Sequence, residues 1–287
     1  MTFSLTRKDG ELQKEERRRM VHWGKWHIWM LPVLFCALAH AQTTQQLIQQ
    51  AVNTELHDDA QDHSHWLFFE VDKKPTNTVE QWVAETAQGD LTSVVAKNGQ
   101  TFTKQQQRNK MNTFINNSAA LAKQRKGSQH DDSQARQMLS MLPNAFIWTK
   151  ESTHDGDTVF DFKPNPQFNP PTWESRVFAA MAGEMTVNDQ QHRIVSLKGR
   201  MIHNVKFLFG LLGVLKAGGS FDVERRQLAP GIWKITQTHV HIQGYALIFK
   251  SISEQEDDVK WAFKQLPQNV SFTQAENEIL QQPQHPK

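Results

Sequence analysis

A dense series of strand patterns in residues 183–253 most limits what this chain can fold into. Apolar and polar residues alternate there in short runs, separated by turn signals at Asp189-Gln190 and Pro230-Gly231. Upstream of this region, strands are predicted at residues 66–72, 79–87, 91–97, 145–152 and 157–164. So many short strands in succession predict one large, curved, antiparallel sheet.

Helix patterns precede and interrupt these strands. Residues 44–57 place apolar side chains at helical spacing with glutamines opposite, which predicts an amphipathic helix. Residues 104–125 carry a thinner apolar stripe, and a further helix is predicted over 131–142, capped by one of its first two aspartates and stopped by Pro143. The predicted fold class is therefore α+β.

One apolar run stands out in a polar chain whose mean hydropathy is −0.61. Residues 207–215, FLFGLLGVL, are too few for a membrane span, which needs about 20 apolar residues. The glycines at 210 and 213 disfavour a helix, because each costs about 1 kcal/mol in a helix interior. In a strand both faces would be apolar and both would need cover. Core packing and a wall facing an apolar ligand both remain open.

The N-terminus has the pattern of a secretory signal peptide. Basic residues precede the apolar stretch 26–39, and small residues at Ala39 and Ala41 place cleavage after Ala41. The compact form of this pattern begins at Met20, which we predict to be the true start. An uncleaved anchor is disfavoured because the stretch is short, and a lipid attachment at Cys36 is disfavoured by the bulky residue before it. We therefore expect export to the periplasm.

Removal of this leader changes the charge balance. Residues 1–41 hold seven of the 32 Lys and Arg residues and four of the 30 Asp and Glu residues, so 25 basic and 26 acidic residues remain. The basic pI of about 8.6 thus results from the excess of basic residues in the leader, and it gives no indication of nucleic-acid binding. The only cysteine also leaves, which suits an oxidising compartment. We expect residues 42–264 to form one domain and residues 265–287 to be a polar C-terminal tail.

Catalytic and metal-binding patterns are sparse. The sequence has no Gly-x-Ser-x-Gly elbow, no His-Glu-x-x-His and no phosphate-binding loop, so we expect no enzyme and no cofactor. His239 and His241 are two residues apart and would share one face of a strand, which makes them weak candidates for a metal site. The His- and Asp-rich residues 57–65 are a second weak candidate.

Two short motifs carry a resemblance to a known family. Gly210-Leu211-Leu212-Gly213 and Pro230-Gly231-Ile232-Trp233, within residues 183–253, resemble the C-terminal half of outer-membrane lipoprotein-sorting proteins, the LolA/LolB/LppX-like carrier superfamily. The order of predicted elements in the rest of the chain is also similar. The resemblance implies a curved antiparallel half-barrel whose concave face is covered by helices, with a hydrophobic cavity between sheet and helices.

The resemblance also implies a function. Members of this superfamily shelter the acyl chains of a lipid or a lipid-modified protein, and they exchange them with a membrane-bound donor or acceptor. The expected cavity neighbours in this sequence are Phe207, Phe209, Leu211, Leu212, Val214, Leu215 and Trp233. A non-catalytic interaction module of the cell envelope with the same fold is the alternative, and a metal-dependent hydrolase is a more distant one.

Overall fold

The computed structural model describes residues 43–207, 213–245 and 253–286, so the predicted signal peptide lies outside the described residues. The helices within these ranges are α1 (Thr44–Gln61), α2 (Lys104–Ile115), α3 (Ser118–Ala145), α4 (Trp173–Phe178) and α5 (Phe272–Gln281). The strands are β1 (His65–Lys74), β2 (Asn77–Ala84), β3 (Leu91–Lys97), β4 (Gln100–Thr101), β5 (Phe146–His154), β6 (Asp157–Pro164), β7 (Met181–Asn188), β8 (Arg193–Met201), β9 (Val205–Phe207), β10 (Gly213–Leu215), β11 (Ser220–Ala229), β12 (Ile232–Tyr245) and β13 (Ser253–Leu266).

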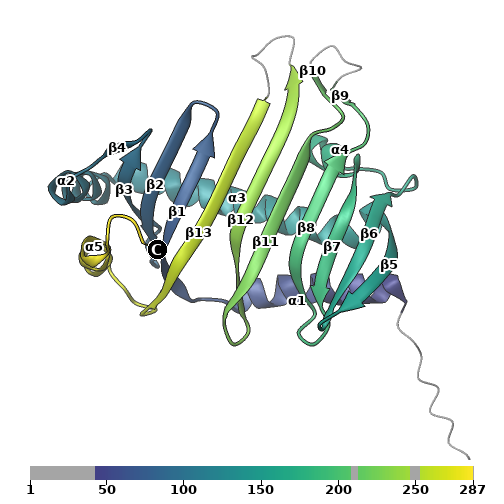
Figure 1. Cartoon of the computed structure of the whole chain (residues 1–287), viewed down its shortest axis with the longest axis horizontal. Helices are drawn as coiled ribbons and strands as arrows, with labels where there is room; N and C mark the ends of the chain where they lie inside the picture. Colours follow the sequence, from purple (N-terminus) through teal and green to yellow (C-terminus); the bar gives the residue numbers. More distant parts are fainter. Residues whose placement is uncertain (1–42, 208–212, 246–252, 287) are drawn as a thin grey trace, which may run out of the picture. The chain divides into compact units, whose positions relative to one another are not determined.

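The strands form one large antiparallel sheet (Figure 1). Eleven of them follow one another in the order β4-β3-β2-β1-β13-β12-β11-β8-β7-β6-β5. The hairpin of β9 and β10 joins the sheet where β10 pairs with β12. In the described residues the end strands β4 and β5 do not pair with each other, so the sheet is open. The predicted α+β class and the predicted antiparallel sheet are confirmed.

Helices lie on both faces of this sheet. We call the face toward α1 and α3 the inner face, and its opposite the outer face. On the inner face, Ile48 of α1 and Met185 of β7 belong to one hydrophobic cluster. On the outer face, Met111 of α2 and Ile279 of α5 pack in a cluster with Trp82 of β2. The sequence predicted helices on the concave face only. This prediction is wrong for α2 and α5, which pack on the outer face.

Two main cores result, one at each end of the sheet. The core under α1 is built by β5–β8 and the end of α3, with Phe146, Trp148, Phe160, Phe162, Met185 and Met201 among its buried side chains. The core under α2 and α5 is built by β1–β3, with Leu67, Phe69, Trp82, Leu91, Phe272 and Ile279 among its buried side chains. A smaller inner-face cluster contains Trp66, Phe68 and Val83.

A buried ion cluster fixes α1 on the sheet. Glu55 of α1 accepts hydrogen bonds from Nε and Nη2 of Arg193 at 3.1 and 2.9 Å, and from the Ile194 N–H at 2.7 Å. Arg225 of β11 adds an ion pair to the same carboxylate at 2.5 Å. Only 4 % of the Arg193 and Glu55 side chains is exposed. Each charge is therefore paired and hydrogen-bonded, as burial requires.

The middle helices differ from the prediction. The helix expected over residues 131–142 is part of the longer α3, which begins after Asn117, whose side chain accepts a hydrogen bond from the Ala120 N–H. Pro143 does not stop it but lies inside its last turn. The carbonyl of Pro143 accepts a hydrogen bond from the Gln45 side chain, so tertiary contacts stabilise a helix end that local propensity disfavours.

The C-terminal residues also differ from the prediction of a loosely held tail over residues 265–287. α5 begins with a capping box, in which the Ser271 and Gln274 side chains satisfy each other's backbone N–H groups. It buries Phe272 and Ile279 against the outer face. Beyond it, the carbonyl of Pro283 accepts a hydrogen bond from the Trp82 indole at 2.8 Å. The chain to this point therefore belongs to the folded domain.

Candidate functional site

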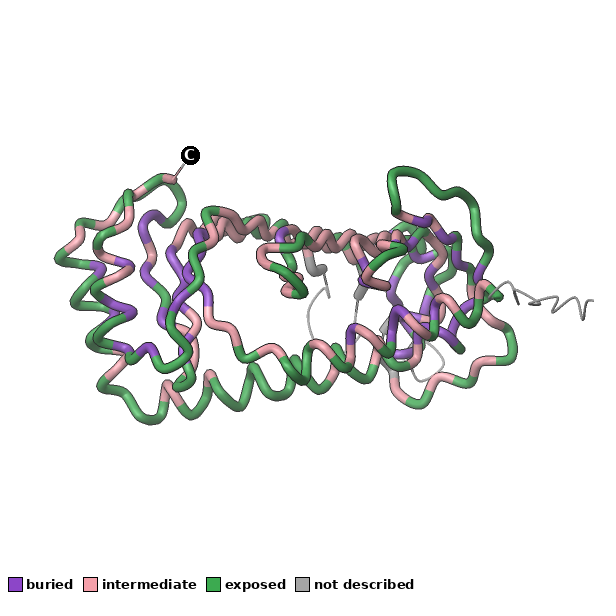
Figure 2. Tube along the Cα trace, turned by 90° about the horizontal axis from the view of Figure 1, so that it is seen from below, coloured by how far each residue is buried: buried purple, intermediate pink, exposed green. Residues whose placement is uncertain are grey.

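The centre of the sheet lacks a core. No residue of β11 is buried, and of residues 232–243 on β12 only Thr236 is buried. Nine consecutive residues of α3, 125–133, are exposed. A helix that packs on a sheet covers a stripe of side chains along one side, so this part of α3 stands clear of the strands. Figure 2 shows α3 and the sheet apart along their middle. The inner face of β11 and β12 is therefore less covered than the two main cores.

Part of this half-buried inner face is apolar. The residues concerned come from β8, β11 and β12 and are all half-buried; together they form what we call the inner apolar strip: Leu197, Phe221, Val223, Val240 and Ile242. Strand register places Leu197 opposite Val223, and Phe221 opposite Val240. Gly199 is required here, because a Cβ atom at this position would collide with the Phe221 ring. The strip is continuous with the core under α1, to which Leu197, Phe221 and Ile242 are packed.

The adjoining part of the inner face is charged. Strands β1 and β13 contribute the inner charged strip: Glu70, Asp72, Lys74, Glu256, Asp258 and Lys260. Lys260 lies 2.7 Å from Asp258 and 3.4 Å from Glu70, and Lys74 lies 3.2 Å from Glu256. Burial alone would lower the pKa of Lys260, but Asp258 and Glu70 reverse this and raise it. Apolar and ionic surfaces thus lie side by side beneath α3.

A further carboxyl group lies where β2 ends. Glu85 accepts a hydrogen bond from the Trp66 N–H at 3.0 Å, and its carboxylate is 4.0 Å from the amine of Lys234. Lys234 pairs more closely with Asp62, at 3.0 Å. Burial raises the pKa of Glu85 to about 7, with Lys234 opposing the shift and the charge of Asp90 adding to it. Glu85 therefore changes charge near neutral pH.

This shift predicts a pH effect on stability. Because the pKa of Glu85 is higher in the folded chain than in the unfolded chain, its protonated form favours folding, and the stabilisation present near pH 4.5 is lost as the pH rises through 7. From pH 5 to pH 8 we expect the free energy of unfolding of the wild type to fall by about 1–2 kcal/mol more than that of Glu85→Gln. Urea denaturation of both proteins across this pH range measures the difference. Parallel pH profiles would contradict the assignment.

Among the described residues that were predicted to line a cavity, Phe207, Val214 and Leu215 lie on the hairpin of β9 and β10, and Trp233 lies apart from them. Leu215 is buried in the core under α1, whereas Val214 is buried but is not part of that core. Phe207 ends β9, where it pairs with Gly213. Trp233 lies near the other end of β12, where its indole donates to the Gln191 side chain. Leu215 pairs with Gly244, eleven residues along β12 from Trp233, which separates them by about 36 Å. Phe209, Leu211 and Leu212 lie outside the described residues.

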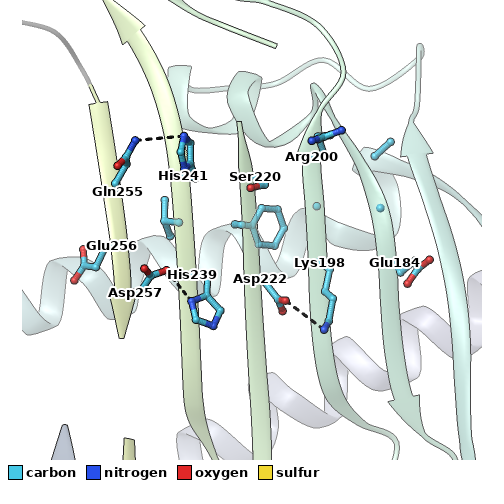
Figure 3. A pocket seen from close by; sticks show the side chains of 15 residues that line it. Glu184, Lys198, Arg200, Ser220, Asp222, His239, His241, Gln255, Glu256 and Asp257 are labelled. Atoms are coloured by element: carbon cyan, nitrogen blue, oxygen red, sulfur yellow. Dashed lines mark hydrogen bonds and ion pairs between the residues drawn. The ribbon is translucent and has the colours of Figure 1, made fainter. Parts of the chain in front are cut away.

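The two histidines do share a face, as predicted. His239 and His241 both lie on the outer face (Figure 3), where His239 pairs with Asp257 at 2.8 Å. Among the described residues, one group of three possible metal ligands has its ligand atoms within 4.8 Å of one another: Glu151, Asp161 and Glu184. Neither histidine belongs to this group. The geometry gives no further support for a metal at the histidines.

Acidic residues in the second candidate metal segment, 57–65, have other partners. Asp58 binds Arg193, Asp59 binds Arg136 at 2.9 Å, and Asp62 binds Lys234. These carboxylates therefore hold α1 to β8, α3 and β12. The segment therefore stabilises the packing of α1, and its residues 57–61 are the last turn of that helix.

Sequence reasoning missed the inner charged strip. The signal was present, because Glu70, Asp72 and Lys74 are two residues apart, as are Glu256, Asp258 and Lys260. Such alternation indicates one polar face of a strand, which is commonly the solvent face. Here it faces α3, because tertiary register decides which face is covered.

No helix among the described residues is both long enough and apolar enough to span a membrane. Comparisons of the chain with protein-family models, with curated proteins and with solved structures found no match.

Proposed function

We propose that this protein is an exported, periplasmic lipid carrier that holds an acyl chain of a lipid or lipid-modified protein between α3 and the inner face. The observation that carries the proposal is the half-buried inner apolar strip beneath the exposed middle of α3. In this proposal the open sheet works as a half-barrel similar to that of LolA-like carriers. The leader, cleaved after Ala41, directs the chain to the periplasm, where it meets a membrane-bound donor or acceptor.

The proposal rests on the free energy of apolar burial. Each CH₂ group that leaves water contributes about 0.8 kcal/mol, so an acyl chain laid along Phe221, Val223 and Val240 would be held without any polar contact. The inner charged strip lies beside this surface and suits the polar end of an amphiphile. A ligand with both parts matches the inner face better than a fully apolar one. An open site beneath α3 also permits release without unfolding the sheet.

Lipid extraction tests this proposal. The protein is purified from the envelope fraction without detergent, and bound lipids are extracted and identified by mass spectrometry. We expect acyl compounds in near-stoichiometric amount. Val240→Glu places a charge on the inner apolar strip and should lower the bound lipid at least tenfold, because the carboxylate must keep its water.

Val259→Glu is the matched control. Val259 is also a half-buried valine, but on the neighbouring strand β13 it lies on the outer face. It should leave the bound lipid unchanged. Absence of acyl compounds from the wild type would favour the interaction module instead, and equal loss in both variants would argue against a site on the inner face.

A further inference from the structure

The outer face carries a separate polar pocket of about 450 Å³ (Figure 3). Its size falls within the range of small-molecule sites, roughly 300–1,000 Å³. Five strands, β7, β8, β11, β12 and β13, contribute to it. Because strand residues alternate between faces, the side chains that line it come from every second position of each strand. The whole sheet separates this pocket from the inner face.

Strand register arranges these side chains in two rows. The first, which we call the donor row, runs across the strands as Ala182, Arg200, Ser220, His241 and Gln255. The second, which we call the acid row, runs as Glu184, Lys198, Asp222, His239 and Asp257. Members of the two rows are two residues apart on each strand, so the rows are about 7 Å apart. The first row is rich in hydrogen-bond donors and the second in carboxylates.

The donor row has unused binding capacity. Arg200 is exposed and makes no hydrogen bond or ion pair with any residue that the structure describes. Its register neighbours Ala182 and Ser220 are small, which leaves room beside the guanidinium. Nε2 of His241 lies 3.0 Å from the Gln243 amide and 3.3 Å from the Gln255 amide, which holds the ring in place. An anionic oxygen group is the natural partner for this row.

The acid row is only partly neutralised. Lys198 lies 3.2 Å from Asp222, and His239 lies 2.8 Å from Asp257. Glu184 has no cationic partner among the described residues. It is a diagonal neighbour of Arg200 on the adjacent strand, at a Cα separation of about 7–8 Å. A free carboxylate and a free guanidinium therefore lie close together without pairing.

We propose that the outer pocket binds a small zwitterion that carries an anionic oxygen group and a primary ammonium a few bonds apart. The anionic group binds Arg200 and Ser220, and the ammonium binds Glu184. The pocket carries groups of both signs, so a molecule with a single charge satisfies only one row. Phosphoethanolamine has the required chemistry, either as a free solute or as the headgroup of a membrane lipid. This site is independent of the proposed acyl site on the inner face.

Calorimetric titration with phosphoethanolamine tests the assignment. We expect saturable binding that is at least tenfold tighter than that of inorganic phosphate or ethanolamine alone. Arg200→Ala and Glu184→Gln should each weaken it at least tenfold. Arg226→Ala is the matched control, because Arg226 is an exposed arginine of β11 that does not line the pocket. Val223→Glu, on the inner apolar strip and outside the lining of this pocket, should leave the affinity unchanged, which separates this site from the inner face.

Vesicles distinguish the two sources of the zwitterion. Co-sedimentation with phosphatidylethanolamine vesicles, but not with phosphatidylcholine vesicles, and its competition by phosphoethanolamine would identify a lipid headgroup. Binding of the soluble zwitterion without vesicle binding would identify a free solute. No measurable binding of phosphoethanolamine, or equal binding by wild type and Arg200→Ala, would overturn the proposal.

Discussion

Replacing Glu55 by alanine is expected to lower the free energy of unfolding by about 3–5 kcal/mol. The carboxylate of Glu55 binds Arg193, the Ile194 N–H and Arg225, and its loss leaves buried cationic charge without its main partner. Because these contacts join α1 to β8 and β11, the change also weakens the packing of α1 on the sheet. Urea denaturation measures the effect as a lower midpoint at an unchanged slope.

Asp59→Ala is the control for this prediction. Asp59 lies on the same helix and pairs with Arg136 at 2.9 Å, but both side chains are more than half exposed, at 59 % and 53 %. Exposed pairs contribute less than about 1 kcal/mol. If Glu55→Ala destabilised the protein no more than Asp59→Ala, the buried cluster would not be what holds α1.

Removing residues 268–287 is expected to destabilise the protein by at least about 5 kcal/mol. The deletion exposes Trp82 and the rest of the outer-face core, and it removes Val270, Phe272 and Ile279, each of which contributes about 1.5–3 kcal/mol by burial. It also removes the carbonyl of Pro283, the acceptor of the Trp82 indole. Urea denaturation of the truncated chain measures the loss. A chain with wild-type stability would mean that the C-terminus is a dispensable tail.

A pair of point substitutions keeps this prediction testable if the truncated chain does not fold. Ile279→Ala should cost about 2–5 kcal/mol, because Ile279 is fully buried. Glu278→Ala, on the neighbouring position of α5, removes only an exposed pair with Lys264 and should cost less than about 1 kcal/mol. Similar costs for the two substitutions would contradict the packing described for α5.

Much of the fold could be predicted from local patterns. The amphipathic pattern of residues 44–57 corresponds to α1, and the five strand patterns between residues 66 and 164 correspond to β1, β2, β3, β5 and β6. The dipeptide Asn98-Gly99 is a strong hairpin signal in the sequence, and both residues have the positive φ values, 51° and 79°, that a two-residue hairpin turn requires. These features depend on residues near one another in the sequence, which is why they could be predicted.

The errors have a different physical origin. The length of α3 depends on contacts of its end with α1, and α5 is stabilised by packing on Trp82, 190 positions before Phe272. The candidate site depends on register, because a shift of one residue exchanges the two faces of a strand. Local patterns could not tell that Glu70 and Lys260 face α3, whereas His239 faces away from it. The polar pocket on the outer face was missed for the same reason.

Fluorescence of a single label on the inner face tests the central claim most directly. Cys36, the only cysteine in the sequence, is replaced by serine, and a polarity-sensitive dye is attached through Val240→Cys or, as control, through Val259→Cys. During titration with palmitate, lipid binding beneath α3 predicts a saturable blue shift for the dye at position 240 and none at position 259. No shift at position 240, or the same shift at both positions, would contradict it.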